Sequence, residues 1–265
     1  MFTYPEIDPV ALDLGFVQIH WYGLMYLIAF LLAWWLGKKR ANMPNSGWTA
    51  DQVSDMIFFG ALGVVLGGRI GYMIFYNFPA LAEDPLALFK IWQGGMSFHG
   101  GLLGVLLAMY FFGRKYKKTF FDTVDFVAPL VPLGYFAGRV GNFINGELWG
   151  RVTDVPWGVI FPHAGPEPRH ASMLYQGILE GLVIFAIVWW FSSKPRPRMA
   201  VSALFAICFG VFRFINEFFR QPDAHLGFVA FDWMSMGQVL SIPLVILGVI
   251  LWVLAYKNED KKSKA

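Results

Sequence analysis

The sequence contains few charged residues and a single cysteine, and both shortages narrow the class of protein. Asp, Glu, Lys and Arg make up 15% of its 265 residues, whereas soluble domains carry about 25%. Hydrophobic residues make up 57% of the chain, so we expect an integral membrane protein. Cys208 is the one cysteine, which excludes an internal disulfide and a thiolate metal cluster.

Motifs of several common enzyme classes are also absent. The chain contains no HExxH zinc motif, no GxSxG nucleophile turn and no P-loop. Zinc proteolysis, serine hydrolysis and nucleotide-driven transport therefore have no positive support. No internal repeat is visible, which weakens an analogy with repeat-built transporters. The first ten residues have neither a basic segment nor a cleavage pattern, so we expect no removable signal peptide.

Seven apolar stretches are interpreted as membrane-spanning helices, because a helix needs about 20 mostly apolar residues to cross a bilayer. They are roughly 17–37, 53–76, 98–113, 120–139, 172–192, 200–219 and 235–256. The expected fold is therefore an all-α bundle of seven transmembrane helices. We expect residues 1–265 to form a single polytopic membrane domain.

Basic residues are concentrated in the loops after the first, third, fifth and seventh stretches. Fourteen of the 21 lysines and arginines lie there. Because such loops stay in the cytoplasm, we expect the N-terminus outside and the C-terminus inside. The other seven fall within spans or on the outer side, and six are arginine, which suits bidentate recognition of phosphate. They are Arg69, Lys90, Arg139, Arg151, Arg169, Arg213 and Arg220.

The segment 138–151, GRVGNFINGELWGR, brings polar residues to the end of the fourth stretch. It contains two arginines, two asparagines, a glutamate and four glycines. Ionisable groups at the edge of lipid are costly, so their presence is a functional hypothesis by default. We expect Arg139 at the outer interface, in a site with Asn142 and Asn145. The alternative is an interfacial anchor or a partner for Glu147.

A second group of charges lies in the sixth stretch. Arg213, Glu217 and Arg220 are spaced i, i+4, i+7 and are expected to share one helical face. Arg213 must then face the bundle interior or a polar cavity. Two interpretations remain open, an internal ion pair that fixes helix packing and a glutamate that orients Arg213 toward a phosphate.

The second stretch combines small and polar residues. Three glycines at four-residue spacing predict a close-packing face: Gly63, Gly67 and Gly71. Arg69, Tyr72 and Tyr76 lie on a neighbouring face, where the tyrosines are either interfacial belt residues or the lining of a polar cavity.

His99 lies where the chain enters the third stretch, and it has two interpretations. An imidazole can accept a proton at neutral pH, but a lone histidine is more often a hydrogen-bonded structural residue. Just before it, residues 78–93 form an amphipathic stretch that we expect to lie flat in the outer interface, where it could rim a lateral entrance for lipid.

Several blocks of the sequence resemble those of bacterial prolipoprotein diacylglyceryl transferases. The run at 138–151 resembles the family signature. The other matching blocks are HWYGLMY at 20–26, GGRIGY at 67–72, GMSFHGG at 95–101 and RFINEFFRQPD at 213–223. Together the blocks cover nearly the whole chain in the family's order.

The resemblance implies an enzyme of the bacterial inner membrane with seven transmembrane helices. Its N-terminus would be periplasmic and its C-terminus cytoplasmic, with a small periplasmic head at about 141–171. It would transfer diacylglyceryl from phosphatidylglycerol to the thiol of the lipobox cysteine of a preprolipoprotein, releasing glycerol phosphate. Its partners would be these two substrates and membrane lipid. We expect no metal, no organic cofactor and no nucleic acid.

The resemblance also assigns residues. The family's phosphatidylglycerol-binding arginine falls on Arg139, its second essential arginine on Arg213 and its proposed catalytic histidine on His99. Further positions that matter in the family hold Tyr22, Asn142 and Glu147. One block departs, because RHASMLYQ stands at 169–176 where RHPSQLYE is expected. No role is therefore expected for a proline or glutamate there.

The resulting hypothesis is alkylation of sulfur, in which the substrate thiolate attacks a glycerol carbon and the phosphate ester leaves. A free cysteine is mostly thiol at neutral pH, so a base such as His99 must favour the thiolate. The leaving phosphate needs preorganised donors, which we assign to Arg139 and Arg213, the latter oriented by Glu217. Tyr22 completes the expected catalytic set, and the lipid-binding set adds Asn142, Glu147 and Tyr76.

Two alternative classes of function would use the same arginines without catalysing a reaction. A transporter or flippase for an anionic lipid or metabolite would use them for binding, and would be expected to have repeated halves. A non-catalytic lipid-binding scaffold would need binding alone. Modification of a lipobox peptide distinguishes the enzyme from both.

Overall fold

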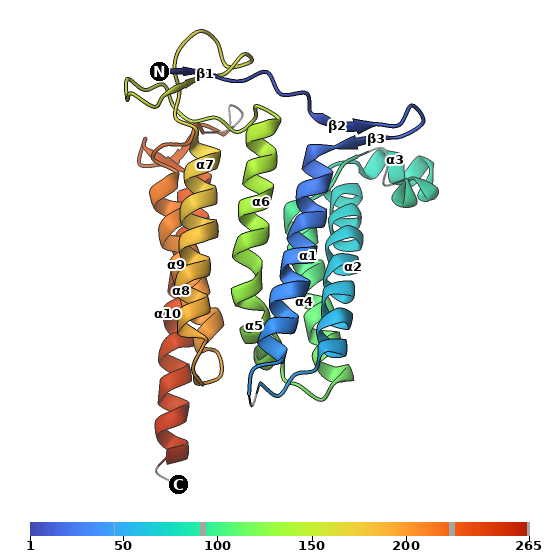
Figure 1. Ribbon diagram of the computed structural model, residues 1–265, viewed down its shortest axis with the longest axis vertical. Coiled ribbons are helices and arrows are strands. Elements are labelled where there is room, and N and C mark those ends of the chain that lie inside the picture. Colours follow the sequence, from blue (N-terminus) through green and yellow to red (C-terminus); the bar gives the residue numbers. More distant parts are fainter. Residues whose placement is uncertain (45, 91–93, 223–225, 264–265) are drawn as a thin grey trace. The chain divides into compact units, whose positions relative to one another are not determined.

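The computed structural model describes residues 1–44, 46–90, 94–222 and 226–263, and most of them are helical (Figure 1). The chain divides into two compact units. Unit 1 is Met1–Ala33 with Asp125–Ala265, and unit 2 is Trp34–Val124. Helix α1 (Trp21–Ala41) and helix α5 (Phe120–Val127) each contribute residues to both units.

The helices of unit 1 are interrupted at two points. Pro129 and Pro132 place a short 3-10 turn, η3 (Ala128–Leu130), between α5 and α6 (Val131–Ile144), because proline cannot donate the helical hydrogen bond. A π-helical segment, η4 (Gly177–Val183), joins α7 (Ser172–Gln176) to α8 (Ile184–Phe191) in one continuous rod (Figure 1).

The remaining helices of unit 1, α9 (Ala200–Asn216) and α10 (Met236–Ser263), pack along each other. Glycines permit the close approach. A Cβ on Gly210 would lie 2.6 Å from Val245 Cγ2, and one on Gly248 would lie 2.7 Å from Ile207 Cγ1. The buried core here includes Ile184 and Val188 from α8, with Cys208 packed against it as a partly buried apolar side chain.

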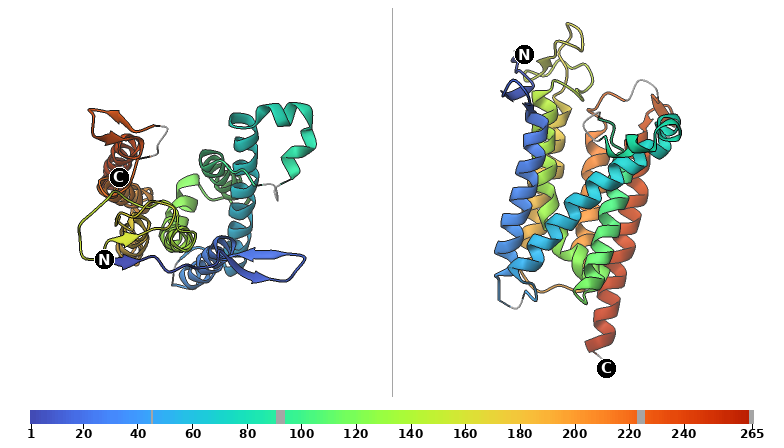
Figure 2. Two further views of the ribbon diagram at one scale, coloured as in Figure 1. Left: turned by 90° about the horizontal axis from the view of Figure 1, so that it is seen from above. Right: turned by 90° about the vertical axis from the view of Figure 1, so that its right-hand side faces the viewer.

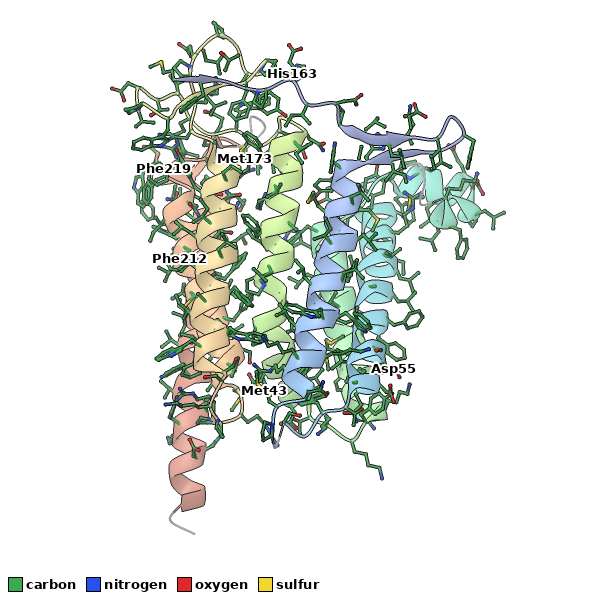
Figure 3. All side chains as sticks on the ribbon, viewed as in Figure 1. Met43, Asp55, His163, Met173, Phe212 and Phe219 are labelled. Carbon is green, nitrogen blue, oxygen red and sulfur yellow. The ribbon has the colours of Figure 1, made fainter. Side chains whose placement is uncertain are left out.

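Short strands and a small core form one end of unit 1. Strand β1 (Phe2–Thr3) pairs in parallel with β4 (Val159–Ile160), while β2 (Val10–Asp13) and β3 (Gln18–His20) form an antiparallel pair. Tyr4, Phe161 and Met173 are buried together beneath the first pair, and Figure 3 labels Met173 at this end of α7. Strands β5 (Phe228–Ala230) and β6 (Met234–Ser235) form the third pair, before α10.

Unit 2 is organised around α2 (Ala50–Phe75) and α4 (Phe98–Lys115), which pack closely (Figure 2). A Cβ on Gly63 would lie 2.6 Å from the carbonyl oxygen of Gly104, and one on Gly67 would collide with that of Gly100. The predicted glycine face of α2 is therefore confirmed. Two shorter elements, α3 (Phe78–Glu83) and η1 (Pro85–Phe89), follow α2.

Membrane-spanning character is clear for most of the long helices. By length and composition, five helical segments of the described chain can cross a membrane: Trp21–Ala41, Ala50–Phe75, Phe120–Ile144, Ser172–Phe191 and Met236–Glu259. The predicted stretches 98–113 and 200–219 are occupied by α4 and by the shorter apolar α9. An integral membrane protein built of helices is thus confirmed, while seven spans and their orientation stay predictions.

Candidate active site

Arg139 lies on α6 and is held by polar partners on the same helix. Its Nη2 donates to the Tyr135 hydroxyl at 2.7 Å, and its Nη1 donates to Asn142 Oδ1 at 3.1 Å. These neighbours stand at i−4 and i+3, so all three side chains share one face. The guanidinium carbon also lies 4.7 Å from the centre of the Tyr135 ring. The orientation of Arg139 is therefore fixed before any ligand binds.

Glu147 folds back toward the end of α6. Gly146 adopts a φ of +63°, which glycine allows at little cost, and the chain turns there. The Glu147 carboxylate then accepts hydrogen bonds from Asn142 Nδ2 at 2.8 Å and from Asn145 Nδ2 at 3.3 Å. Arg139 and Glu147 are thus joined through Asn142.

Tyr22 lies against the same part of α6. A Cβ on Gly141 would lie 3.0 Å from Tyr22 Cδ2, so α1 and α6 approach closely between Arg139 and Asn142. The Tyr22 side chain interacts electrostatically with both Arg139 and Glu147. Unit 1 therefore brings four of the predicted site residues together.

Glu217 is the centre of the second predicted group. It is fully buried, and its Oε1 lies 2.5 Å from Arg213 Nη2 and 3.6 Å from Arg220 Nη1. Its Oε2 accepts a hydrogen bond from Ser235 Oγ at 2.6 Å. A Cβ on Gly237 would lie 2.5 Å from the Glu217 carboxyl carbon, so only glycine leaves space for this carboxylate.

The single helical face predicted for Arg213, Glu217 and Arg220 is wrong in one respect. Helix α9 ends at Asn216, and Arg220 follows a turn and forms a bridge with Gly150. Proline disfavours a helical conformation in the residue before it, and Pro222 follows shortly after Arg220. Arg220 reaches Glu217 through the turn instead of along a helix.

Two further arginines, Arg151 and Arg169, bind backbone carbonyl oxygens. Arg151 donates to the carbonyl oxygens of Arg220 at 3.1 Å and Glu217 at 3.2 Å. Arg169 donates to those of Ala164 and Gly150, each at 3.3 Å. These two arginines fasten the loops around the site, and Arg139 and Arg213 remain the better candidates for binding an anion.

Three residues that the sequence reasoning missed connect those two arginines. The Glu180 carboxylate on η4 accepts hydrogen bonds from the Tyr135 hydroxyl at 2.5 Å and from Asn216 Nδ2 at 2.8 Å. It also interacts electrostatically with Arg213 and Arg139. The sequence did contain a signal for Glu180, since it is an acidic residue within the apolar stretch 172–192. An ionisable residue inside a membrane span is a functional hypothesis by default.

The arginine–carboxylate cluster is defined here as Arg139, Arg151, Arg213, Arg220, Glu147, Glu180 and Glu217. Hydrogen bonds through Tyr135 and Asn142 join Arg139 to Glu180 and Glu147, and ion pairs join Glu217 to Arg213 and Arg220. Asn216, the neighbour of Glu217 in the chain, donates to Glu180, and Arg151 binds the backbone of Glu217 and Arg220. Four guanidinium groups face three carboxylates, which leaves one positive charge in excess. One excess charge complements a phosphodiester, which carries a single negative charge.

The other predicted site residues lie in unit 2. His99 is the second residue of α4, is exposed and contacts the Phe98 ring edge-on at 5.6 Å. Tyr76 ends α2, is 68% exposed and stacks on Tyr72. Of the predicted amphipathic stretch 78–93, residues 78–89 form α3 and η1, and residues 91–93 lie outside the described residues.

The departing block at 169–176 lies at the junction of the small core and α7. His170 Nδ1 is 3.2 Å from the Tyr175 hydroxyl, which also accepts a hydrogen bond from Trp157 Nε1 at 2.8 Å. Partial burial lowers the pKa of the His170 imidazole, and Asp154 acts in the opposite direction. Gln176 is buried.

In the described part of the chain, no cluster of three His, Cys, Asp or Glu side chains could hold a metal ion.

Comparison with known proteins identifies the family. A sequence model of the family described as prolipoprotein diacylglyceryl transferase matches residues 9–254. A relative from Photobacterium profundum is 60% identical over 261 residues, which cover 98% of each chain. One from Coxiella burnetii (strain RSA 331 / Henzerling II) is 58% identical over 261 residues, covering 98% of this chain and 100% of the relative.

A third relative, from Pseudomonas aeruginosa (strain LESB58), is 54% identical over 265 residues, which cover 100% of this chain and 100% of the relative. All three relatives are named phosphatidylglycerol–prolipoprotein diacylglyceryl transferase. The match extends over all the blocks that form the arginine–carboxylate cluster. This chain therefore belongs to the prolipoprotein diacylglyceryl transferase family.

Proposed function

We propose that this protein transfers the diacylglyceryl group of phosphatidylglycerol to the lipobox cysteine of a preprolipoprotein, and that the arginine–carboxylate cluster binds the lipid phosphate. Family membership and the names of the full-length relatives support the reaction. The observation that carries the site is the link from Arg139 through Tyr135 and Glu180 toward α9, where Arg213 is paired with Glu217.

The proposed reaction is a displacement at carbon. The cysteine thiolate attacks the diacylglyceryl carbon that bears the phosphate oxygen, a carbon–sulfur bond forms, and the carbon–oxygen bond breaks. The electron pair leaves with glycerol phosphate, and the thiol proton passes to a base. His99 is our candidate for that base, because the family resemblance assigns it and its imidazole is exposed.

The arginines act on the leaving group. Negative charge grows on the departing phosphate oxygen, and preorganised cationic donors stabilise it more in the transition state than in water. Arg139 presents a guanidinium already oriented by Tyr135 and Asn142. Glu217 holds Arg213 in the same way.

The other predicted residues bind the lipid around the phosphate. Asn142 and Glu147 present amide and carboxylate groups that suit the glycerol hydroxyls of the headgroup. Tyr22 closes the site on the α1 side of Gly141. The exposed ring of Tyr76 is proposed to contact lipid, since tyrosine favours the membrane interface.

We further propose seven transmembrane helices in the bacterial inner membrane, with a periplasmic N-terminus and a cytoplasmic C-terminus. Fourteen of the 21 basic residues lie in four alternate loops, which supports this orientation. The segment 141–171 and the reaction then belong to the periplasmic side, where prolipoprotein substrates emerge. Residues 1–265 act in this proposal as one polytopic membrane domain.

The test is a reconstituted reaction with defined substrates. Purified full-length protein is incubated with phosphatidylglycerol vesicles and a lipobox peptide, and the peptide mass and released glycerol phosphate are measured. We expect a diacylglyceryl adduct and an equal amount of glycerol phosphate. A folded protein that binds the lipid without forming the adduct would support a transporter or a lipid-binding scaffold instead.

A further inference from the structure

Glu180 is a fully buried carboxyl group of the arginine–carboxylate cluster, and the proposed reaction gives it no step of its own. It lies within ILEGLVIFAIVWW, a run of otherwise apolar residues at 178–190. Burying an isolated carboxylate costs several kcal/mol unless charged and hydrogen-bonding partners compensate. The partners of Glu180 therefore indicate why this acid is present.

Both carboxylate oxygens of Glu180 accept a hydrogen bond, each from a different helix. Oε2 accepts from the Tyr135 hydroxyl, which itself accepts from Arg139 Nη2 at 2.7 Å. Oε1 accepts from Asn216 Nδ2 at 2.8 Å, and Asn216 follows Arg213 by three residues on α9. Glu180 thus stands between the helices that carry the two arginines, and it interacts electrostatically with both guanidinium groups.

The local backbone is built to bring Glu180 to this position. Residues Gly177–Val183 are π-helical, a conformation that is frequent at functional sites because it re-aims side chains within a helix. Two glycines let this segment approach α6. A Cβ on Gly181 would lie 2.6 Å from Phe136 Cβ, and one on Gly177 would lie 3.3 Å from Arg139 Cβ.

Charge balance gives a second reason for an acid at this point. Without Glu180, the arginine–carboxylate cluster would contain four guanidinium groups and two carboxylates. Arg139 and Arg213 would then repel each other across a site of low dielectric constant, where such repulsion is strong. With Glu180 they share a counter-ion, and a single positive charge remains for the phosphodiester.

We infer that Glu180 is the positioning residue that holds the guanidinium groups of Arg139 and Arg213 at the spacing required by one phosphate. The inference rests on the proposed function, and Glu180 acts through Tyr135 and Asn216 without touching substrate. The side chain is a scaffold for the arginine pair and takes no part in proton transfer.

The first test is Glu180→Gln, which keeps the shape of the side chain and removes its charge. In the peptide-modification assay we expect kcat/KM for phosphatidylglycerol to fall about 10-fold, with KM for the peptide unchanged. Asp125→Asn is the matched control, because Asp125 is a unit 1 carboxylate that caps α9 by accepting from Met199 N at 2.7 Å and Ser202 N at 2.8 Å. This control is expected to lower stability and to leave turnover per folded molecule intact.

The second test combines Glu180→Gln with Tyr135→Phe, which removes the hydroxyl between Glu180 and Arg139. If Glu180 acts through Tyr135, the double variant loses little more activity than either single variant. The inference would be overturned if the fold-losses of kcat/KM in the two single variants multiplied in the double variant. It would also be overturned if Asp125→Asn lowered kcat/KM as much as Glu180→Gln does. If Glu180→Gln fails to fold, Tyr135→Phe alone tests the inference. Full turnover in Tyr135→Phe would show that Glu180 does not act on Arg139 through the Tyr135 hydroxyl. Absence of turnover in the unsubstituted protein would instead contradict the proposed function.

Discussion

Arg69 in unit 2 and Arg139 in unit 1 are both arginines in apolar helices, but they are bonded differently. All three Arg69 side-chain nitrogens donate to backbone carbonyl oxygens of η1 and of residues that follow it. These acceptors belong to Ala87, Leu88, Lys90, Gly94 and Gly95. Arg139 donates to two side-chain oxygens, the Tyr135 hydroxyl and Asn142 Oδ1. These side chains in turn donate to the carboxylates of Glu180 and Glu147.

In our proposal this difference separates a structural arginine from one that binds a ligand. Backbone carbonyls are fixed acceptors, so Arg69 is fully engaged in fastening η1, Lys90, Gly94 and Gly95 to α2. Arg139 has five N–H donors, and its two bonds orient the guanidinium toward the rest of the arginine–carboxylate cluster. The same residue type in a similar sequence setting therefore serves stability in one unit and, in our proposal, chemistry in the other.

Substituting the two arginines is expected to give opposite defects. Arg139→Ala is expected to lower the rate of glycerol phosphate release about 10²–10³-fold while the protein still folds, because it removes a transition-state donor. Arg69→Ala is expected to reduce stability by about 3 kcal/mol, because one buried and several partly buried carbonyl oxygens lose a charged donor. Activity per folded molecule and thermal unfolding in lipid nanodiscs measure the two effects. Equal defects in both variants would remove the distinction between the arginines.

Glycine packing in unit 2 should also affect stability more than chemistry. Gly67→Ala is expected to lower the unfolding temperature sharply, because its Cβ would collide with the backbone of Gly100 and overpacking typically costs about 1–3 kcal/mol. Gly60→Ala on the same helix is the matched control, since its Cβ would meet only Met109 Cε at 3.6 Å. A comparable loss in the two variants would show that the α2–α4 contact is looser than described.

The smallest expected effect concerns pH and the small core of unit 1. Burial lowers the pKa of His170, so below about pH 6.5 the unfolded chain binds a proton more readily than the folded one. Stability should therefore decline as the pH falls through this window, and His170→Gln should flatten that dependence. His163→Gln, which removes an exposed histidine, serves as the control. Unfolding temperatures between pH 5 and 8 test this, and an unchanged slope in His170→Gln would contradict it.

Element positions were predictable because apolar length alone determines a spanning helix. The expected stretch 53–76 is α2 at Ala50–Phe75, and 120–139 begins where α5 begins. Helix ends were less predictable. The fourth stretch continues to Ile144 and ends before Gly146, whose positive φ turns the chain, whereas α9 ends at Asn216, before the predicted limit.

The candidate site was predictable only in part. Arg139, Arg213 and Glu217 were found because charge in an apolar span is costly and therefore conspicuous. Tyr135 and Asn216 were missed because an uncharged polar residue in a helix gives no such signal. Their role depends on which helices meet and on the π-helical segment that aims Glu180 between them, and neither follows from residue spacing.

The central claim is that Arg139 and Arg213 act on one phosphate, and a double-mutant cycle tests it most directly. The measurement is kcat/KM for phosphatidylglycerol in the unsubstituted protein, Arg139→Lys, Arg213→Lys and the double variant. Our account predicts non-additive losses, with a coupling of about 0.5–3 kcal/mol, as for groups in one network. Losses that simply add would show that the two arginines act independently and would contradict it.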